Sequence, residues 1–195
     1  MLKPQTMPVW IQPTALDEWP TQNVTSEALK YRLPICQRWQ LTPIINQTPM
    51  EQEHIFLGTQ PGELLTIGYM AQANPNHDLQ KWVETLLHIT GLPILHWQSL
   101  EPAPKLIEWQ SIELPFDLCQ QMKVDEILSY QGLAQAPNSS TGLLRIYSIL
   151  LRRHTEAWKI HLSLSSACLP GVPEEMVERN DHVRAGATFG FLQLL

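Results

Sequence analysis

Cys168 and two histidines are the residues whose types could form a nucleophilic catalytic site. Cys168 ends the run Ser165–Cys168, just before a predicted helix N-terminus, where a thiolate is stabilised. A catalytic cysteine also needs a base, and His161 or His182 could supply it. No known sequence signature surrounds these three residues. A packed thiol is therefore the simpler interpretation, and an enzyme with a scattered Cys/His site is an alternative function.

Familiar motifs for catalysis, phosphate binding and metal binding are absent from the sequence. It has no GxSxG, GxGxxG or GxxxxGK[ST] motif. No histidines occur in HxxxH or HExxH spacing, and no cysteines form a CxxC pair. Pairs of neighbouring carboxylates are better explained as solvated charges or as acids at helix starts. We therefore expect no enzymatic activity, no metal site and no cofactor.

A dense polar block lies near the C-terminal end, between Glu178 and Arg184. One interpretation is a helix end with intrahelical pairs, Glu178 with His182 at i, i+4 and Asp181 with Arg184 at i, i+3. The other is a contact patch for a protein partner. In that case Arg179, Asp181, His182 and Arg184 would bind the partner.

Residues 1–28 are rich in proline, threonine and glutamine and show no clean hydrophobic period. We expect an irregular N-terminal arm that packs on the domain through Trp10 and Trp19, because a disordered tail is normally poorer in aromatic residues. These two tryptophans are further candidates for partner binding. The length of 195 residues favours one domain, which we place at 29–195.

Turn residues divide the rest of the chain into short elements. The best helix is 78–89, where apolar residues recur at helical spacing between a capping Asp78 and Gly91. The cleanest strand is 157–164, whose strict alternation predicts one buried face. The segment 60–63 predicts a tight turn, and 137–142 an exposed loop. The other strands are expected at 31–33, 39–45, 53–58, 64–70, 92–100, 106–114, 126–134, 143–151 and 188–195, with a short helical turn at 116–122 and a helix at 174–186 that Gly186 ends.

Short connections between these strands favour antiparallel neighbours, so the expected fold class is α+β, with helices on the faces of a mainly antiparallel sheet. The composition of 44% apolar and 16% charged residues excludes a disordered chain and a coiled coil. The net charge of −6 argues against a nucleic-acid partner. No uninterrupted apolar run reaches the ~18 residues of a membrane span. With no secretory signal pattern and an odd number of cysteines, we expect a cytoplasmic protein that is not an integral membrane protein.

Several segments between 29 and 195 together carry a family resemblance. They are Tyr31–Pro34 with Trp39, Leu64–Ile67, Leu79–Val83, Leu144–Tyr147, Ala157–Ile160 and Phe189–Leu192. In order and pattern they resemble the fold shared by the photosystem PsbP proteins, the Ran-binding Mog family and a bacterial family of PsbP-like domains. That fold is an α/β/α sandwich with a central, mainly antiparallel sheet, and the resemblance implies binding rather than catalysis.

Bacterial proteins similar to this pattern include small cytoplasmic chaperones that accompany type VI secretion effectors and shield their apolar transmembrane segments. The resemblance therefore implies a protein partner, such as an apolar helix of a secreted effector, held by a chaperone or adaptor. This chain departs from the pattern in its N-terminal arm and its proline-rich middle. A structural subunit that forms a homodimer through an exposed sheet edge is a further alternative.

Overall fold

The computed structural model describes residues 9–14, 19–43, 45–46, 51–73, 78–94, 97, 100–115, 117–137, 142–166 and 171–195. Its helices are η1 (Val9–Ile11), α1 (Leu79–Thr90), α2 (Leu118–Met122) and α3 (Glu174–Phe189). Its strands are β1 (Thr21–Ser26), β2 (Tyr31–Cys36), β3 (Gln40–Leu41), β4 (Ile45–Asn46), β5 (Glu51–Leu57), β6 (Leu64–Met70), β7 (Lys105–Ser111), β8 (Glu126–Gln135), β9 (Leu143–Arg153), β10 (Glu156–Ser166) and β11 (Gln193–Leu194).

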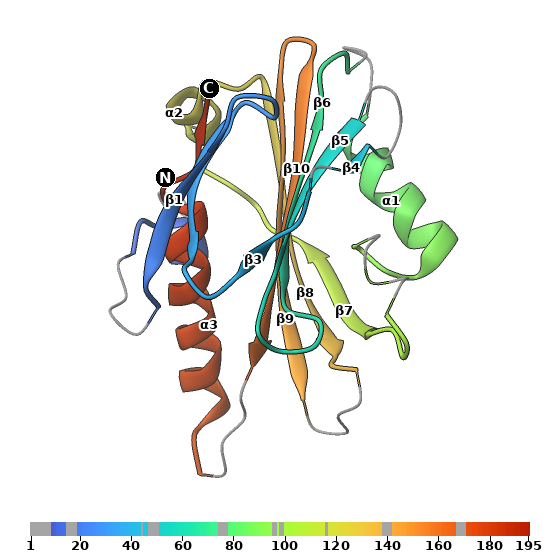
Figure 1. Cartoon of the computed structure of the whole chain (residues 1–195), viewed down its shortest axis with the longest axis vertical. Helices are drawn as coiled ribbons and strands as arrows, with labels where there is room; N and C mark the ends of the chain where they lie inside the picture. The colour runs from blue at the N-terminus through green and yellow to red at the C-terminus, as the bar shows by residue number, and fades with distance from the viewer. Residues whose placement is uncertain are drawn as a thin grey trace, which may run out of the picture.

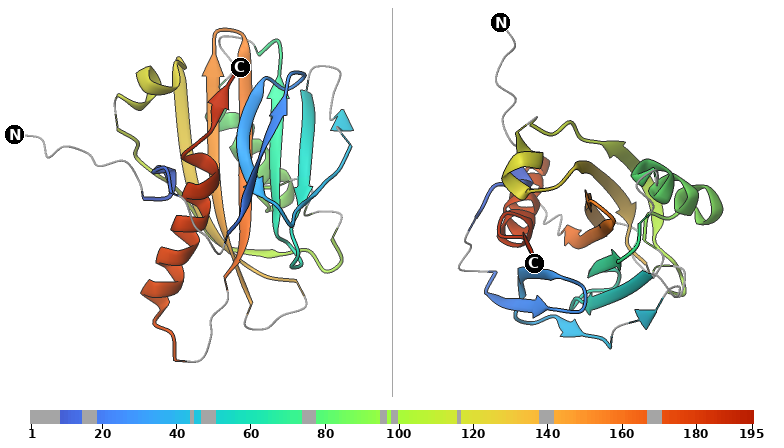
Figure 2. Two further views of the ribbon diagram at one scale, coloured as in Figure 1. Left: turned by 60° about the vertical axis from the view of Figure 1, so that its left-hand side comes forward. Right: turned by 90° about the horizontal axis from the view of Figure 1, so that it is seen from above.

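The strands form a large and a small sheet. In the large sheet the order is β3-β5-β6-β10-β9-β8-β7, with β4 also paired to β5, and the small sheet has the order β1-β2-β11. Neighbouring strands are antiparallel in both sheets. Figures 1 and 2 show α3 and the small sheet on one face of the large sheet and α1 on the other. The predicted α+β class with a mainly antiparallel sheet is confirmed.

Both faces of the central strand β10 are buried. Trp158, Ile160, Leu162 and Leu164 belong to the core on the α3 side. The prediction that only this face would be buried was wrong, because Lys159, His161 and Ser163 on the opposite face are buried as well. That opposite face is covered by α1 and by the chain that follows it. Leu79 and Val83 of α1 pack on Leu150 and Ala157, and Leu92, Ile94 and Trp97 pack on Leu144 and Ile146.

Local signals correctly predicted the elements that depend on neighbouring residues. The side chain of Asp78 accepts hydrogen bonds from the backbone N–H groups of Gln80 and Lys81 and starts α1. Gly91 ends the helix in the left-handed conformation, at φ 69°. The predicted turn at 60–63 is closed by the N–H of Glu63, which donates to the carbonyl of Gln60 at 3.0 Å.

Several expected elements in the described residues differ from the structure. The strand expected at 39–45 is replaced by the short strands β3 and β4. The described part of 92–100 contains no strand, and its apolar residues instead form a cluster on the sheet. Gly186 does not end α3, which continues to Phe189, so the expected strand 188–195 shrinks to β11. Pro34 does not end β2, because β11 pairs with β2 only at Tyr31 and Arg32 and leaves Pro34 without a ladder bond to lose on that side. The loop predicted at 137–142 falls mostly on 138–141, outside the described residues.

The expected arm at 1–28 is partly regular. β1 pairs with β2 along its whole length, so the expected boundary between residues 28 and 29 cuts through a hairpin. Gln12 and Pro13, which follow η1, pack on α3 at Gly186 and on Gly190, the residue that follows the helix. A Cβ added at Gly186 would lie 2.6 Å from the carbonyl oxygen of Gln12, and one at Gly190 would lie 2.5 Å from Cα of Pro13. Glycine at both positions therefore lets the arm approach the helix. Among the described helices, none has the length and apolar character that crossing a membrane requires.

Candidate functional site

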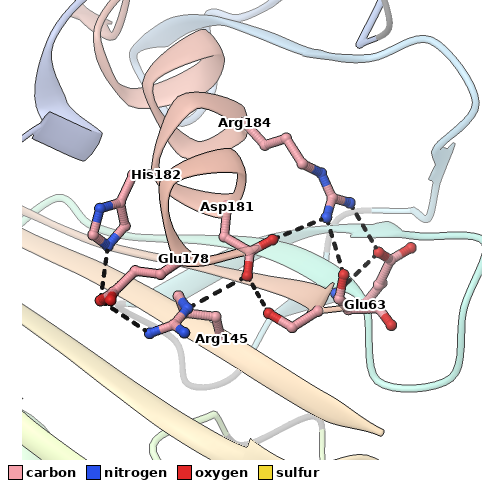
Figure 3. A network of polar contacts seen from close by, with 8 residues as sticks. Glu63, Arg145, Glu178, Asp181, His182 and Arg184 are labelled. Carbon is pink, nitrogen blue, oxygen red and sulfur yellow. Dashed lines mark hydrogen bonds and ion pairs between the residues drawn. The ribbon is translucent and has the colours of Figure 1, made fainter. Parts of the chain in front are cut away.

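Asp181 lies at the centre of a polar network between α3 and the large sheet (Figure 3). Its side chain is 1% exposed and accepts hydrogen bonds from the hydroxyl of Ser166, from Arg145 Nε at 3.4 Å and from Arg184 Nη1 at 3.3 Å. Burial raises the pKa of Asp181, although its hydrogen bond from Ser166 and the two nearby arginines oppose the shift. The carboxylate thus joins the end of β10, the start of β9 and α3.

Arg184 joins the same helix to the turn before β6. Its Nη2 lies 3.2 Å from Glu63 Oε1, and its Nη1 donates to the carbonyl of Ser165 at 3.0 Å. The guanidinium carbon also lies 4.3 Å from the ring centroid of Trp19, a cation–π distance. Trp19 in turn packs edge-on against Trp39 at 5.8 Å. The structure therefore brings together Trp19 and Arg184, two residues predicted to bind a partner, but in an intramolecular contact.

The two predicted intrahelical pairs are both present. His182 Nε2 lies 3.7 Å from Glu178 Oε1, and Arg184 Nη1 lies 3.3 Å from Asp181 Oδ1. Burial lowers the pKa of His182, which keeps the imidazole neutral near pH 7. Glu178 also pairs with Arg145 of β9 at 3.4 Å. Most of the C-terminal polar block therefore attaches α3 to the sheet.

Arg179 and Trp10 complete the residues predicted to bind a partner. Arg179 is exposed on α3, away from the buried network. Trp10 is only 2% exposed and packs on Tyr147 at 5.3 Å and on Phe189 at 5.5 Å. A fully packed indole offers no surface to a partner, so Trp10 serves the core in this structure. Arg179 is the one residue among the six that is exposed, whereas Trp19, His182 and Arg184 are half-buried.

The histidines proposed as partners of Cys168 lie on opposite faces of the large sheet. His161 Nδ1 is 2.5 Å from the hydroxyl of Ser148 on β9. His182 instead packs on the ring of Tyr147, the preceding residue of β9, at 5.8 Å. Since successive residues of a strand point to opposite faces, the sheet separates the two imidazoles. Cys168 itself lies outside the described residues.

His161 is held neutral inside the protein. It is 1% exposed, and burial, assisted by the charge of Lys159, lowers its pKa to about 3. Its Nε2 and the hydroxyls of Thr66 and Ser163 have no hydrogen-bond partner among the described residues. Among the described residues, no group of three histidine, cysteine, aspartate or glutamate side chains lies close enough together to hold a metal ion.

A polar cleft of about 1030 Å³ lies beside the turn between β9 and β10. Its charged groups largely satisfy one another. Glu156 accepts hydrogen bonds from Lys30, from the hydroxyl of Tyr69 at 2.7 Å and from Arg153 at 3.1 Å. Burial alone would raise the pKa of Glu156, but these three donors outweigh it and the pKa is lowered. We therefore interpret the charged side chains of this cleft as a surface cluster of ion pairs.

A second hollow of about 860 Å³ lies between α1 and the start of β8, and we call it the α1–β8 groove. In Figure 2 (right), α1 and the segment from β7 towards α2 border this part of the sheet. Its apolar lining comes from Val83, Leu87, Trp109, Ile112, Leu114 and Leu128. Trp109 stacks on Tyr130 at 5.3 Å with an interplanar angle of 9°. Val83, Leu87, Trp109 and Leu128 belong to the apolar cluster on the α1 side of the sheet, whereas Ile112 and Leu114 also pack against the core on the α3 side.

The margin of the α1–β8 groove is polar. Gln80, Glu84, Glu113, Gln120 and Asp125 line it and are exposed. An apolar centre within a polar rim is the usual anatomy of a protein interface. Two buried atoms in the lining, Trp109 Nε1 and Ser129 Oγ, lack hydrogen-bond partners among the described residues. Such orphaned groups are uncommon in folded proteins.

The α1–β8 groove was not predicted from the sequence. One signal was available, because the apolar stripe of the predicted helix 78–89 is broad and includes Leu87, which is only half-buried where it packs against the sheet. The position of Trp109 opposite Tyr130 depends on strand pairing and could not be deduced. Comparison of the chain with protein-family models and with curated proteins gave no match.

Proposed function

We propose that this protein is a non-enzymatic binding module that receives an apolar segment of a partner protein in the α1–β8 groove. The observation that carries the proposal is the groove itself, in which an apolar lining with a stacked Trp109–Tyr130 pair is surrounded by exposed polar residues. Amphipathic segments commonly bind proteins in grooves of this kind. The proposal therefore assigns partner binding to α1 and β8 rather than to the C-terminal polar block.

The family resemblance leads to a more specific proposal. A PsbP-like α/β/α sandwich is supported by helices on opposite faces of an antiparallel sheet, with the small sheet as an addition. The corresponding role is a cytoplasmic chaperone or adaptor for a type VI secretion effector, whose apolar helix would occupy the groove. Co-purification of one defined effector at native expression levels would support this role, and a chain that remains alone would oppose it.

A direct test uses a synthetic peptide with an apolar leucine–alanine core of about 12 residues and uncharged ends. We expect saturable binding in isothermal titration calorimetry. The variants Leu87→Gln and Leu114→Gln should each abolish it, because both side chains line the groove and are half-buried. Ile107→Gln is the matched control, since Ile107 is 55% exposed on β7 and does not line the groove. Equal binding by all variants would contradict the proposal.

A further inference from the structure

The α1–β8 groove is lined by negative charge. Glu84 of α1, Glu113 after β7 and Asp125 before β8 line it, and no lysine or arginine is among its lining residues. This charge reaches the aromatic centre of the groove. Burial raises the pKa of the Tyr130 hydroxyl, and the carboxylates of Glu84 and Asp78 raise it further. Clefts lined by one sign of charge concentrate ligands of the opposite sign.

The contacts of two of these carboxylates involve no lysine or arginine among the described residues. Glu84 accepts a hydrogen bond from the neutral amide of Gln80 at 2.5 Å. Asp125 accepts one from the backbone N–H of His154 at 2.5 Å, and His154 Nδ1 is 3.5 Å away. Within the part of the chain that the structure describes, neither carboxylate forms an ion pair with lysine or arginine. A bound cation would therefore meet carboxylates that no arginine or lysine already neutralises.

We infer that the α1–β8 groove selects apolar segments that carry lysine or arginine at their ends, an inference that rests on the proposed function. The apolar lining binds the centre of the segment, and the carboxylates at the rim bind its basic ends. The stacked pair of Trp109 and Tyr130 adds an aromatic surface near which a guanidinium or ammonium group is favourable. A second copy of this chain is a poor occupant, because two copies with a net charge of −6 each repel one another.

The test compares two peptides that share the apolar core and differ only at their ends, which are Lys-Lys in one and Glu-Glu in the other. We expect the lysine-ended peptide to bind about tenfold more tightly at low ionic strength, as a few exposed charge pairs would produce. The difference should shrink as salt is added. Glu84→Lys should remove or reverse the preference. Glu175→Lys makes the same charge change at an exposed position of α3 and should preserve it.

The outcomes separate this inference from the proposed function. Equal binding of both peptides, unchanged in Glu84→Lys, would overturn the charge selection and leave the groove as a binding site. Loss of preference in Glu175→Lys as well as Glu84→Lys would also overturn it, because the effect would then arise from net charge. Failure of either peptide to bind would overturn the proposed function. Self-association of the free protein that Leu87→Gln abolishes, measured by sedimentation, would assign the groove to a second copy and contradict the inference.

Discussion

Arg184 Nη2 lies 3.2 Å from Glu63 Oε1, across 121 positions of sequence. This ion pair fastens α3 to the turn before β6, and both side chains are largely removed from solvent. Arg184 therefore stabilises the fold, whereas the sequence suggested that this residue contacts a partner. A substitution of Arg184 should therefore change the stability of the fold.

Arg184→Ala should destabilise the fold. Removing one partner of a buried pair leaves Glu63 and Asp181 with less compensation, which costs about 3 kcal/mol. In a domain of this size that lowers Tm by roughly 6–12 °C. Arg179→Ala, on the exposed side of the same helix, should leave Tm unchanged. Thermal unfolding followed by circular dichroism measures both, and equal Tm values for the two variants would refute the assignment.

The pair of Lys159 and Glu51 should respond to a double-mutant cycle. Their charged atoms are 3.0 Å apart under α1, and Lys159 Nζ lies 4.5 Å from the ring centroid of Trp82. Lys159→Met leaves the Glu51 carboxylate buried without its cation and should cost about 3 kcal/mol in urea unfolding. Adding Glu51→Gln should recover much of this loss, because the uncompensated charge is gone. Additive losses in the double variant would show that the two residues act independently.

His161 should make the protein less stable in mild acid. Its pKa is lowered to about 3 in the folded state from the ordinary histidine value of 6.5, so the unfolded chain binds the extra proton between those pH values. The contribution of His161 is complete above about pH 6.5 and is lost as the pH falls towards 3. At pH 5 the loss is about 2 kcal/mol. His161→Gln should show a smaller fall in urea stability between pH 7.5 and pH 5, and an unchanged fall would exclude His161 as its source.

Gly186→Ala should destabilise α3 although alanine is the better helix former. In an ordinary helix interior this change stabilises by about 1 kcal/mol. Here the new Cβ would meet the carbonyl oxygen of Gln12 at 2.6 Å and force the arm away from the helix. We expect a net loss of about 1–3 kcal/mol in urea unfolding. Asn180→Ala, at an exposed position of the same helix, is the control and should not destabilise; a stabilising Gly186→Ala would show that the arm does not pack there.

The features that sequence reasoning predicted depend on residues close together in the chain. Asp78 and Gly91 set the ends of α1 through their own backbone neighbours, and the pairs at i, i+3 and i, i+4 within α3 follow from helix geometry. The remaining partners of the polar block could not be deduced, because Glu63 and Arg145 reach it only through the sheet. Gly186 looked like a helix end for the same reason, since only the packed arm explains a glycine within the helix.

Even less of the candidate site could be predicted from the sequence, because the site depends on tertiary structure. The six residues predicted to bind a partner include Trp10, Asp181 and Arg184, whose side chains are used inside the molecule. The α1–β8 groove arises where β7 ends at Ser111 and the chain leaves the sheet towards α2. Nothing local marks that departure apart from the Pro115 that follows it.

The indole N–H signals of the seven tryptophans test the binding site most directly. The measurement is a two-dimensional ¹H–¹⁵N spectrum of the full chain, recorded while the uncharged-ended apolar peptide is added. We expect the Trp109 signal to move in a saturable way, because its ring lines the groove, and the signals of the buried Trp10 and Trp158 to stay in place. A shift of Trp19 with Trp109 unchanged would place the binding surface at the α3 network and contradict the account.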